Sequence, residues 1–176
     1  MTQVKPFADN VEALRSFGFQ PRPVKPGYKA CKLKGWQRPD REIPPEELNS
    51  WSKKYASYGM GLLLGSEFPD GTRLGALDID QDDYVRVSSA LLGGPVCGRI
   101  GAKGVAWFVR IDGDISIKKF DVRCEGGTPV HVGELLCQKR LLVIPPTIHP
   151  DTNAAYRWVG KPLLEIDYTD LPIVEV

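Results

Sequence analysis

The sequence predicts an α+β domain of two layers, in which a largely antiparallel sheet is flanked by helices. Short apolar segments with strand-like alternation fill most of the second half of the chain, and earlier stretches carry apolar residues at helical spacing. Helical and strand segments do not alternate strictly, which argues against a parallel βαβ fold. The 176 residues are enough to bury one core and short for two. We therefore expect one domain.

Three segments have the start and stop signals of helices. Each begins at acidic, asparagine or proline residues and closes at glycine, which accepts the left-handed conformation of a helix end. The middle segment carries Leu48, Trp51 and Tyr55 at helical spacing, which indicates core positions. The predicted limits are Asp9 or Asn10 to Gly18, Pro44-Pro45 to Tyr58-Gly59, and Asp82-Asp83 to Gly93-Gly94.

Strands are predicted where apolar and β-branched residues gather between turn signals. Prolines between positions 20 and 42 predict an extended basic loop without regular structure. Asp112-Gly113 and Gln138-Lys139 have the composition of hairpin turns. The predicted strands are 61–65, 74–80, 105–111, 115–122, 129–137 and 140–145, followed by a short extended segment at 156–159.

Composition and charge are those of a soluble globular protein. Apolar residues make up 42% of the chain and charged residues 26%, and the net charge is +1. The N-terminus lacks the features of a signal peptide, so we expect a cytoplasmic location without a membrane segment. Basic residues cluster at 22–41 and around Lys118, Lys119, Lys139 and Arg140, either as phosphate contacts or as a solvated face. Four scattered cysteines, without a C-x-x-C pair, indicate packed reduced thiols: Cys31, Cys97, Cys124 and Cys137.

The segment LGALDID places two carboxylates on one side of a strand. Because strand side chains alternate, Ala76, Asp78 and Asp80 point one way and their neighbours the other. Two like charges so placed raise each other's pKa unless a cation lies between them, which suits a hard divalent ion. D-x-D is a weak motif, however. The alternative is that Asp78 is an exposed strand residue and Asp80 belongs to the start of the next helix.

Glu134 interrupts the apolar strand PVHVGELLC, on the face expected to carry Val130 and Val132. A carboxylate in such a place needs a partner or a metal. Together with Asp78 and Asp80, it could hold two magnesium or manganese ions. The alternative is a buried ion pair with Arg99, Arg110 or Arg123.

Several motifs resemble the bifunctional primase-polymerase domain of plasmid, phage and archaeal replication proteins, which belongs to the archaeo-eukaryotic primase superfamily. They are Trp36, the G-M-G-L run at 59–62, L-D-I-D at 77–80, and V-G-E-L-L at 132–136 followed by RLLVIPPTIHPDTNAAYRWVG at 140–160. The late loop is the most specific part. The resemblance extends from about residue 18 to 160 and implies the fold of that superfamily's catalytic core.

The resemblance implies particular roles for matching residues. Asp78, Asp80 and Glu134 stand where the family binds its catalytic Mg²⁺ or Mn²⁺ ions. His149, in the H-P-D-T stretch, either contacts the triphosphate or is a loop residue satisfied by backbone. Tyr156 and Trp158 either stack on a base or belong to the core.

The chain also departs from the family pattern. Many members have Ser-x-His on the strand after the acidic pair, whereas this chain has RIGAKGVAWFVR at 99–110. The missing histidine leaves Arg99, Lys103 or Arg110 to contact phosphates, along with Lys139, Arg140 and His149. Gly101 and Gly104 either let backbone amides approach an anion or simply form a turn. Asn153 replaces a usual glycine, which is a mild change because asparagine tolerates the left-handed conformation.

The function implied is metal-dependent, template-directed nucleotidyl transfer by a DNA primase or polymerase in plasmid, phage or mobile-element replication. Its partners would be a single-stranded DNA template, a primer, nucleoside triphosphates and a replicative helicase, with the basic loop from Arg22 to Lys34 following the template. Two alternatives are a non-catalytic nucleic-acid-binding replication module and a metal-dependent nuclease. The missing histidine favours the module, and the three retained acids oppose it. No helicase motif is present, as expected of a fragment or a stand-alone core.

Overall fold

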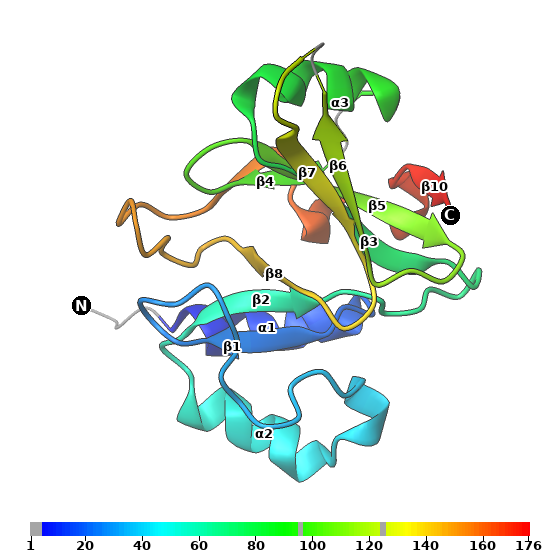
Figure 1. Cartoon of the computed structure of the whole chain (residues 1–176). Helices are drawn as coiled ribbons and strands as arrows, with labels where there is room; N and C mark the ends of the chain where they lie inside the picture. The colour runs from blue at the N-terminus through cyan, green and yellow to red at the C-terminus, as the bar shows by residue number, and fades with distance from the viewer. Residues whose placement is uncertain (1–4, 95–96, 124–125) are drawn as a thin grey trace.

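The computed structural model describes residues 5–94, 97–123 and 126–176. The predicted α+β class is confirmed: helices accompany strands that pair almost entirely antiparallel. The strands form two sheets rather than one (Figure 1). A three-stranded sheet has the order β1-β2-β8, and a seven-stranded sheet has the order β6-β7-β3-β5-β4-β9, with β10 added parallel to β5.

The described strands are β1 (Pro21–Val24), β2 (Gly59–Leu63), β3 (Arg73–Ile79), β4 (Cys97–Ile100), β5 (Val105–Asp112), β6 (Ile117–Val122), β7 (Val130–Leu136), β8 (Leu141–Ile144), β9 (Arg157–Gly160) and β10 (Ile173–Glu175). The α-helices are α1 (Pro6–Ser16), α2 (Pro45–Lys54) and α3 (Val85–Leu91). The 3-10 helices are η1 (Asp40–Glu42), η2 (Asp82–Tyr84), η3 (Leu163–Glu165) and η4 (Tyr168–Asp170).

The helix predictions are confirmed with shifted limits. α1 starts at Pro6, before the expected capping residues, because proline is well accommodated at the first helical position. Gly18 ends it with a φ of 83°. The segment that starts at Asp82 is first the 3-10 turn η2 and only then α3, and Gly93 and Gly94 follow it with positive φ.

Two predictions about chain pairing are wrong. Residues 20–42 are not wholly irregular, because β1 pairs antiparallel with β2 at the edge of the three-stranded sheet. Prolines are tolerated on an edge strand whose nitrogens face away from the neighbour. Asp112-Gly113 and Gln138-Lys139 are not hairpin turns either: β5 and β6 are not neighbours, and β7 and β8 belong to different sheets.

The main core lies between the two sheets. Leu62 of β2 and Leu142 of β8 pack with Ala76 of β3 and Leu136 of β7, and all four are buried. α1 and α2 lie beside the three-stranded sheet, and α3 lies at the opposite end of the molecule (Figure 1). The face of β3 that carries Ala76 is therefore turned toward the smaller sheet.

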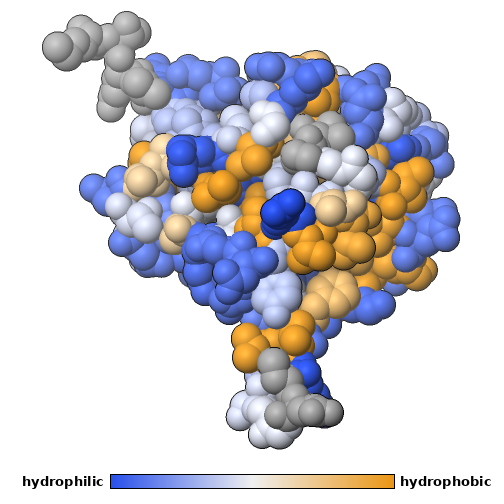
Figure 2. Space-filling view, turned by 90° about the horizontal axis from the view of Figure 1, so that it is seen from above, coloured by the Kyte–Doolittle hydropathy of each residue, from blue (hydrophilic) through white to orange (hydrophobic). Residues whose placement is uncertain are grey.

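α3 and the β6–β7 hairpin expose apolar side chains at the end of the molecule seen in Figure 2. Those exposed most are Leu91 (81%), Val130 (50%) and Val87 (48%). In β6 the apolar Phe120 and Val122 alternate with Lys119 and Asp121, so they lie on opposite faces of the strand. The apolar residues of this hairpin strand are thus turned away from the charged ones.

Three of the four cysteines lie within the described residues, and all three are buried: Cys31, Cys97 and Cys137. Burial raises the pKa of Cys97 to about 12 and that of Cys137 to about 11. These thiols stay protonated at neutral pH, as packed core residues do. Cys124 lies outside the described residues.

Candidate active site

The three predicted acids lie together on one face of the seven-stranded sheet. Asp78 of β3 is directly opposite Glu134 of β7 in the antiparallel register, so the two side chains share a face. Asp80 follows two residues after Asp78. Ala76, two residues before Asp78, is fully buried, whereas the side chains of Asp78 and Asp80 are 28% and 46% exposed. The acids therefore lie where the packing between the sheets ends.

A β-bulge in β7 brings a fourth residue to this face. Phe120 pairs with Gly133 and Asp121 pairs with His131, which leaves Val132 without a partner on β6. The extra residue reverses the alternation. His131, rather than Val130 and Val132, therefore shares the face of Glu134, which corrects the expected set. Regular alternation was assumed for β7, and the sequence has no signal that marks the bulge.

Each of the three acids lies beside a basic side chain. Arg99 Nη2 is 3.7 Å from Asp78 Oδ2, and Lys119 Nζ is 3.6 Å from Glu134 Oε1. His131 Nε2 is 3.3 Å from Asp80 Oδ2 and 3.8 Å from Glu134 Oε1. Of the basic residues proposed for the Glu134 ion pair, Arg99 instead faces Asp78. His131 and Lys119 were not predicted as site residues.

The pKa of Asp78 is raised above that of an ordinary aspartate. Burial is the main cause, and the neighbouring carboxylates of Asp80 and Glu134 raise the pKa further, while the Arg99 guanidinium lowers it. Net, the surroundings disfavour the ionised form. A cation placed among the three carboxylates would reverse that preference.

Arg99 connects the acids to the late P-P-T-x-H-P loop. Its guanidinium carbon lies 5.1 Å from the centre of the Tyr156 ring, and Tyr156 packs against His149 at 5.2 Å between ring centres. Gly101 packs so closely beneath these two rings that a β-carbon there would lie 2.8 Å from Tyr156. Tyr156 is buried and Trp158 packs on Phe108, so both have the core environment that was one of the two alternatives.

His149 is a buried, neutral loop residue. Its Nδ1 accepts a hydrogen bond from the backbone N–H of Asp151 at 3.2 Å, and the backbone N–H of His149 donates to the carbonyl of Ala154. Burial lowers its pKa, and the charge of Lys29 lowers it further. Asn153 in the same loop has a φ of 53°, in the left-handed region that asparagine tolerates. The structure thus shows a backbone partner for Nδ1, and a triphosphate contact stays a prediction.

The G-A-K-G turn lies beside the end of β3. A β-carbon on Gly104 would lie 1.8 Å from the carbonyl oxygen of Ile79, so only glycine fits there. The Gly104 N–H donates to Asp82 Oδ1 at 2.7 Å, which means that a carboxylate of the chain itself already occupies this amide. Lys103 is exposed on the same turn. This turn therefore places the exposed Lys103 beside the end of β3.

Arg110 does not lie with the acids. It is four residues along β5 from Ala106, the partner of Asp78, or about 13 Å at the rise of a strand. Its guanidinium donates to the carbonyls of Leu171 and Thr169 and to the carboxylate of Asp70. These three bonds give Arg110 a structural explanation: it holds the segment before β10 against the large sheet.

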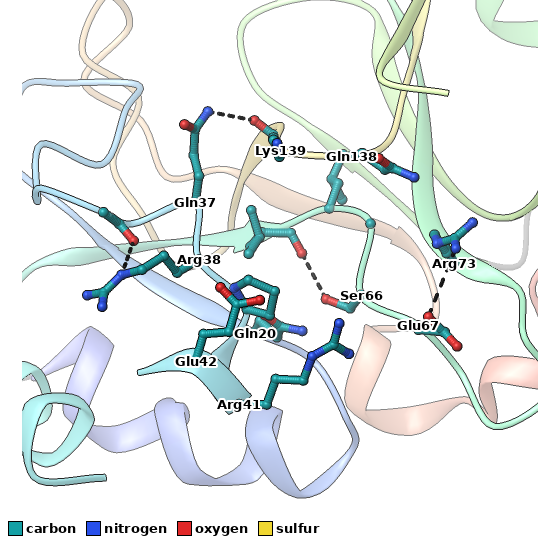
Figure 3. A pocket seen from close by; sticks show the side chains of 15 residues that line it. Gln20, Gln37, Arg38, Arg41, Glu42, Ser66, Glu67, Arg73, Gln138 and Lys139 are labelled. Carbon is teal, nitrogen blue, oxygen red and sulfur yellow. Dashed lines mark hydrogen bonds and ion pairs between the residues drawn. The ribbon is translucent and has the colours of Figure 1, made fainter. Parts of the chain in front are cut away.

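Lys139 and Arg140 lie in the connection between the two sheets, away from the acids. Lys139 lines a pocket of about 600 Å³ together with Gln37, Arg41 and Arg73 (Figure 3). Gln37 Nε2 donates to the Lys139 carbonyl across this pocket at 3.0 Å. Arg73 begins β3, five residues before Asp78, or about 17 Å away along the strand. The pocket is therefore separate from the acidic face.

Arg22 is fully buried, so it cannot contact a template strand. This corrects the prediction that the basic loop follows the template from Arg22 onward. The Arg22 guanidinium donates to the carbonyls of Trp36 and Arg38 at 2.6 Å each and to Asp40 Oδ1 at 2.6 Å. Arg22 instead holds the chain at 36–40 onto β1. The lysines of this loop remain exposed, and Lys29 pairs with Asp151 at 2.7 Å, next to His149.

Nearly the whole chain matches one family model, described as bifunctional DNA primase/polymerase, N-terminal, over residues 10–174. The chain belongs to this family. Membership implies DNA and nucleotides as substrates of a primase-polymerase fold. No curated protein matches the chain. Within the described residues, no helix is both long and apolar enough to cross a membrane.

Proposed function

We propose that the chain catalyses template-directed nucleotidyl transfer. The 3′-hydroxyl of a primer, or of an initiating nucleotide, attacks the α-phosphate of an incoming triphosphate, and pyrophosphate leaves. The observation that carries this proposal is the shared face of Asp78, Asp80 and Glu134, with Asp78 directly opposite Glu134 on the neighbouring strand. Family membership supports the same chemistry.

The donor set fits two hard divalent ions, Mg²⁺ or Mn²⁺, because carboxylate oxygens are the ligands these ions prefer. Such ions would activate the attacking hydroxyl and neutralise the leaving pyrophosphate. As the side chains lie, no three His, Cys, Asp or Glu groups within residues 5–94, 97–123 and 126–176 are close enough together to hold a metal. Metal binding therefore requires the carboxylates to turn toward one another, away from Arg99 and Lys119.

Movement of the carboxylates onto a metal would also leave their basic neighbours free to bind phosphates. Arg99 is mostly buried, and among the described residues its Nε has no hydrogen-bond partner. Once Asp78 turns to a metal, the charge of this guanidinium is available to a phosphate oxygen. Lys119 and Lys103 are exposed beside Glu134 and beside the end of β3, respectively. Arg99, Lys103 and Lys119 are thus the proposed phosphate contacts at this face, and Arg99 takes the place of the histidine that the chain lacks.

The test is extension of a labelled primer on a single-stranded template, with deoxynucleotides and either Mg²⁺ or Mn²⁺. Extension by the unaltered chain should be lost in the Asp78→Ala, Asp80→Ala double variant. Asp83→Asn is the matched control, because Asp83 is exposed and lies in the same acidic stretch. That control should extend the primer normally.

Two outcomes would overturn the proposal. Shortening of the primer, if it depends on the same acids, would identify a nuclease. Salt-sensitive binding of the template without extension in either metal would favour a non-catalytic replication module.

A further inference from the structure

His131 is held in a defined orientation beside two of the acids. Its Nδ1 lies 3.0 Å from Asp121 Oδ1, on the directly opposite residue of β6. In the tautomer whose Nδ1 hydrogen is donated to this carboxylate, Nε2 is the nitrogen that can bind a metal. Nε2 is the atom that points at Asp80 and Glu134. Metal-binding histidines are commonly oriented in this way, with a carboxylate hydrogen-bonded to one ring nitrogen and the metal bound by the other.

The distances at Nε2 are close to those between ligands of one ion. Neighbouring ligands on an octahedral ion with bonds of about 2.1 Å lie roughly 3 Å apart. His131 Nε2 lies 3.3 Å from Asp80 Oδ2 and 3.8 Å from Glu134 Oε1. As the side chains lie in the described residues, these three groups do not converge on one point, so Glu134 would have to turn from Lys119 toward His131 and Asp80.

We propose that His131 is a nitrogen ligand of one divalent ion, shared with Asp80 and Glu134, and that Asp121 is the residue that positions it. This inference rests on the proposed function. It adds a ligand class to the three acids and predicts the preferred metal. Mg²⁺ is bound mainly through oxygen, whereas first-row transition metals also accept imidazole. The metal site that includes His131 should therefore bind Mn²⁺ in preference to Mg²⁺.

The bulge in β7 is what makes this ligand available. Without it, His131 would point to the opposite face of the sheet, away from Asp80. Gly133, next to the bulge, lies so close to β3 that an added β-carbon would be 2.2 Å from the Asp78 carbonyl oxygen. The local backbone thus fixes the position of His131 relative to β3.

Pulsed electron paramagnetic resonance of bound Mn²⁺ tests the ligand directly, because a coordinated imidazole couples its ¹⁴N nucleus to the metal. The chain has two histidines, His131 and His149, which gives a matched pair of variants. We expect the coupling in the unaltered protein and in His149→Gln, and its loss in His131→Ala. Mn²⁺ affinity should fall about 10-fold or more in His131→Ala, with a smaller loss of Mg²⁺ affinity.

Asp121→Asn tests the positioning role. The expected result is an unchanged melting temperature without metal, retained ¹⁴N coupling, and Mn²⁺ affinity about 10-fold weaker. Mn²⁺ that binds with unaltered affinity to His131→Ala, or without ¹⁴N coupling to the unaltered protein, would overturn the inference while leaving the acids as the metal site. If the unaltered protein binds no Mn²⁺, or binds it equally well after Asp80→Ala, both this inference and the proposed metal centre fail.

Discussion

Asp78 is held in an environment that opposes its own charge. Its pKa is raised by burial and by Asp80 and Glu134, and Arg99 offsets this only in part. Folding therefore favours the protonated carboxyl, and the protein loses stability as the pH rises from the ordinary aspartate pKa through the raised one. A binding site that keeps like charges together for a ligand is expected to be destabilising in this way.

Replacing this carboxylate by an amide should stabilise the metal-free protein. At pH 7.5, Asp78→Asn should raise the free energy of unfolding by roughly 1 kcal/mol, or the melting temperature by about 3 °C. The gain should disappear near pH 3, where Asp78 is protonated in both the folded and the unfolded state. Calorimetry in the presence of a chelator measures both values. A variant less stable at pH 7.5 would show that the pair with Arg99 outweighs the repulsion.

The shared face of the acids was predictable from the sequence, and their basic neighbours were not. Strict alternation along LGALDID put Asp78 and Asp80 on one face, and the structure shows this arrangement, because His131 contacts both Asp80 and Glu134, the residue opposite Asp78. The neighbours of these acids depend on strand order. Arg99 reaches Asp78 only because β4 lies on the far side of β5, and Lys119 reaches Glu134 only because β6 pairs with β7. Residue patterns within a segment contain no information about which strands pair.

At the scale of elements, the close contact between β3 and β7 depends on one glycine. A β-carbon at Gly133 would lie 2.2 Å from the Asp78 carbonyl oxygen and 3.1 Å from Ile79 Cα, and both of these atoms are backbone. The strands would have to separate, which would also draw Glu134 away from Asp78.

Gly133→Ala should therefore destabilise the protein by about 3 kcal/mol, as other severe overpacking does, and weaken Mn²⁺ binding. Gly126→Ala is the comparison, because Gly126 has a φ of 72° but open space around it. It should lower stability by about 1 kcal/mol and leave Mn²⁺ affinity unchanged. Urea denaturation and Mn²⁺ titration distinguish them, and equal effects of the two variants would contradict the role of the contact.

The segment after β1 depends on a buried arginine. Arg22 has no exposed surface and donates to two backbone carbonyls of residues 36–38 as well as to Asp40. Burial lowers its pKa, and Asp40 counteracts this. Arg22→Ala should lower the free energy of unfolding by about 3–5 kcal/mol, since the carbonyls of Trp36 and Arg38 lose their buried donor and Asp40 keeps only Arg15 as a partner. Arg41→Ala, at an exposed neighbouring position, should change it by less than about 0.5 kcal/mol.

Strand prediction succeeded where apolar residues were continuous and failed where pairing came from tertiary context. The segments that became β3, β5, β6, β7 and β8 were all predicted, whereas β1, β4 and β10 were not. β1 contains two prolines, and β10 has three residues and pairs parallel to β5. β1 and β10 form because they pair with β2 and β5, and contacts such as that of Arg110 with the Leu171 carbonyl hold β10 in place, which is tertiary information.

At the scale of the whole molecule, the exposed basic loop and the late loop lie together on the Arg99 side of the acids. Lys29 is paired with Asp151, two residues from His149, and His149 packs on Tyr156 beneath Arg99. Lys25 and Lys32 lie over the Tyr28 ring. This chain of contacts links the lysine-rich loop to the Arg99 side of the candidate active site, which is the path that we propose for a template strand.

Removing lysines from this loop should reduce the salt dependence of template binding. Each phosphate contact with a single strand contributes about 0.7 to the slope of log affinity against log salt. The Lys32→Ala, Lys34→Ala double variant should therefore reduce that slope by about 1.4, as measured by fluorescence anisotropy of a labelled single-stranded oligonucleotide. The Lys53→Ala, Lys54→Ala double variant on α2 is the matched control, because α2 lies beside the three-stranded sheet (Figure 1). The salt slope of template binding by this variant should equal that of the unaltered protein. Equal slopes for both double variants would mean that the template follows a different surface, while leaving the acidic face as the candidate active site.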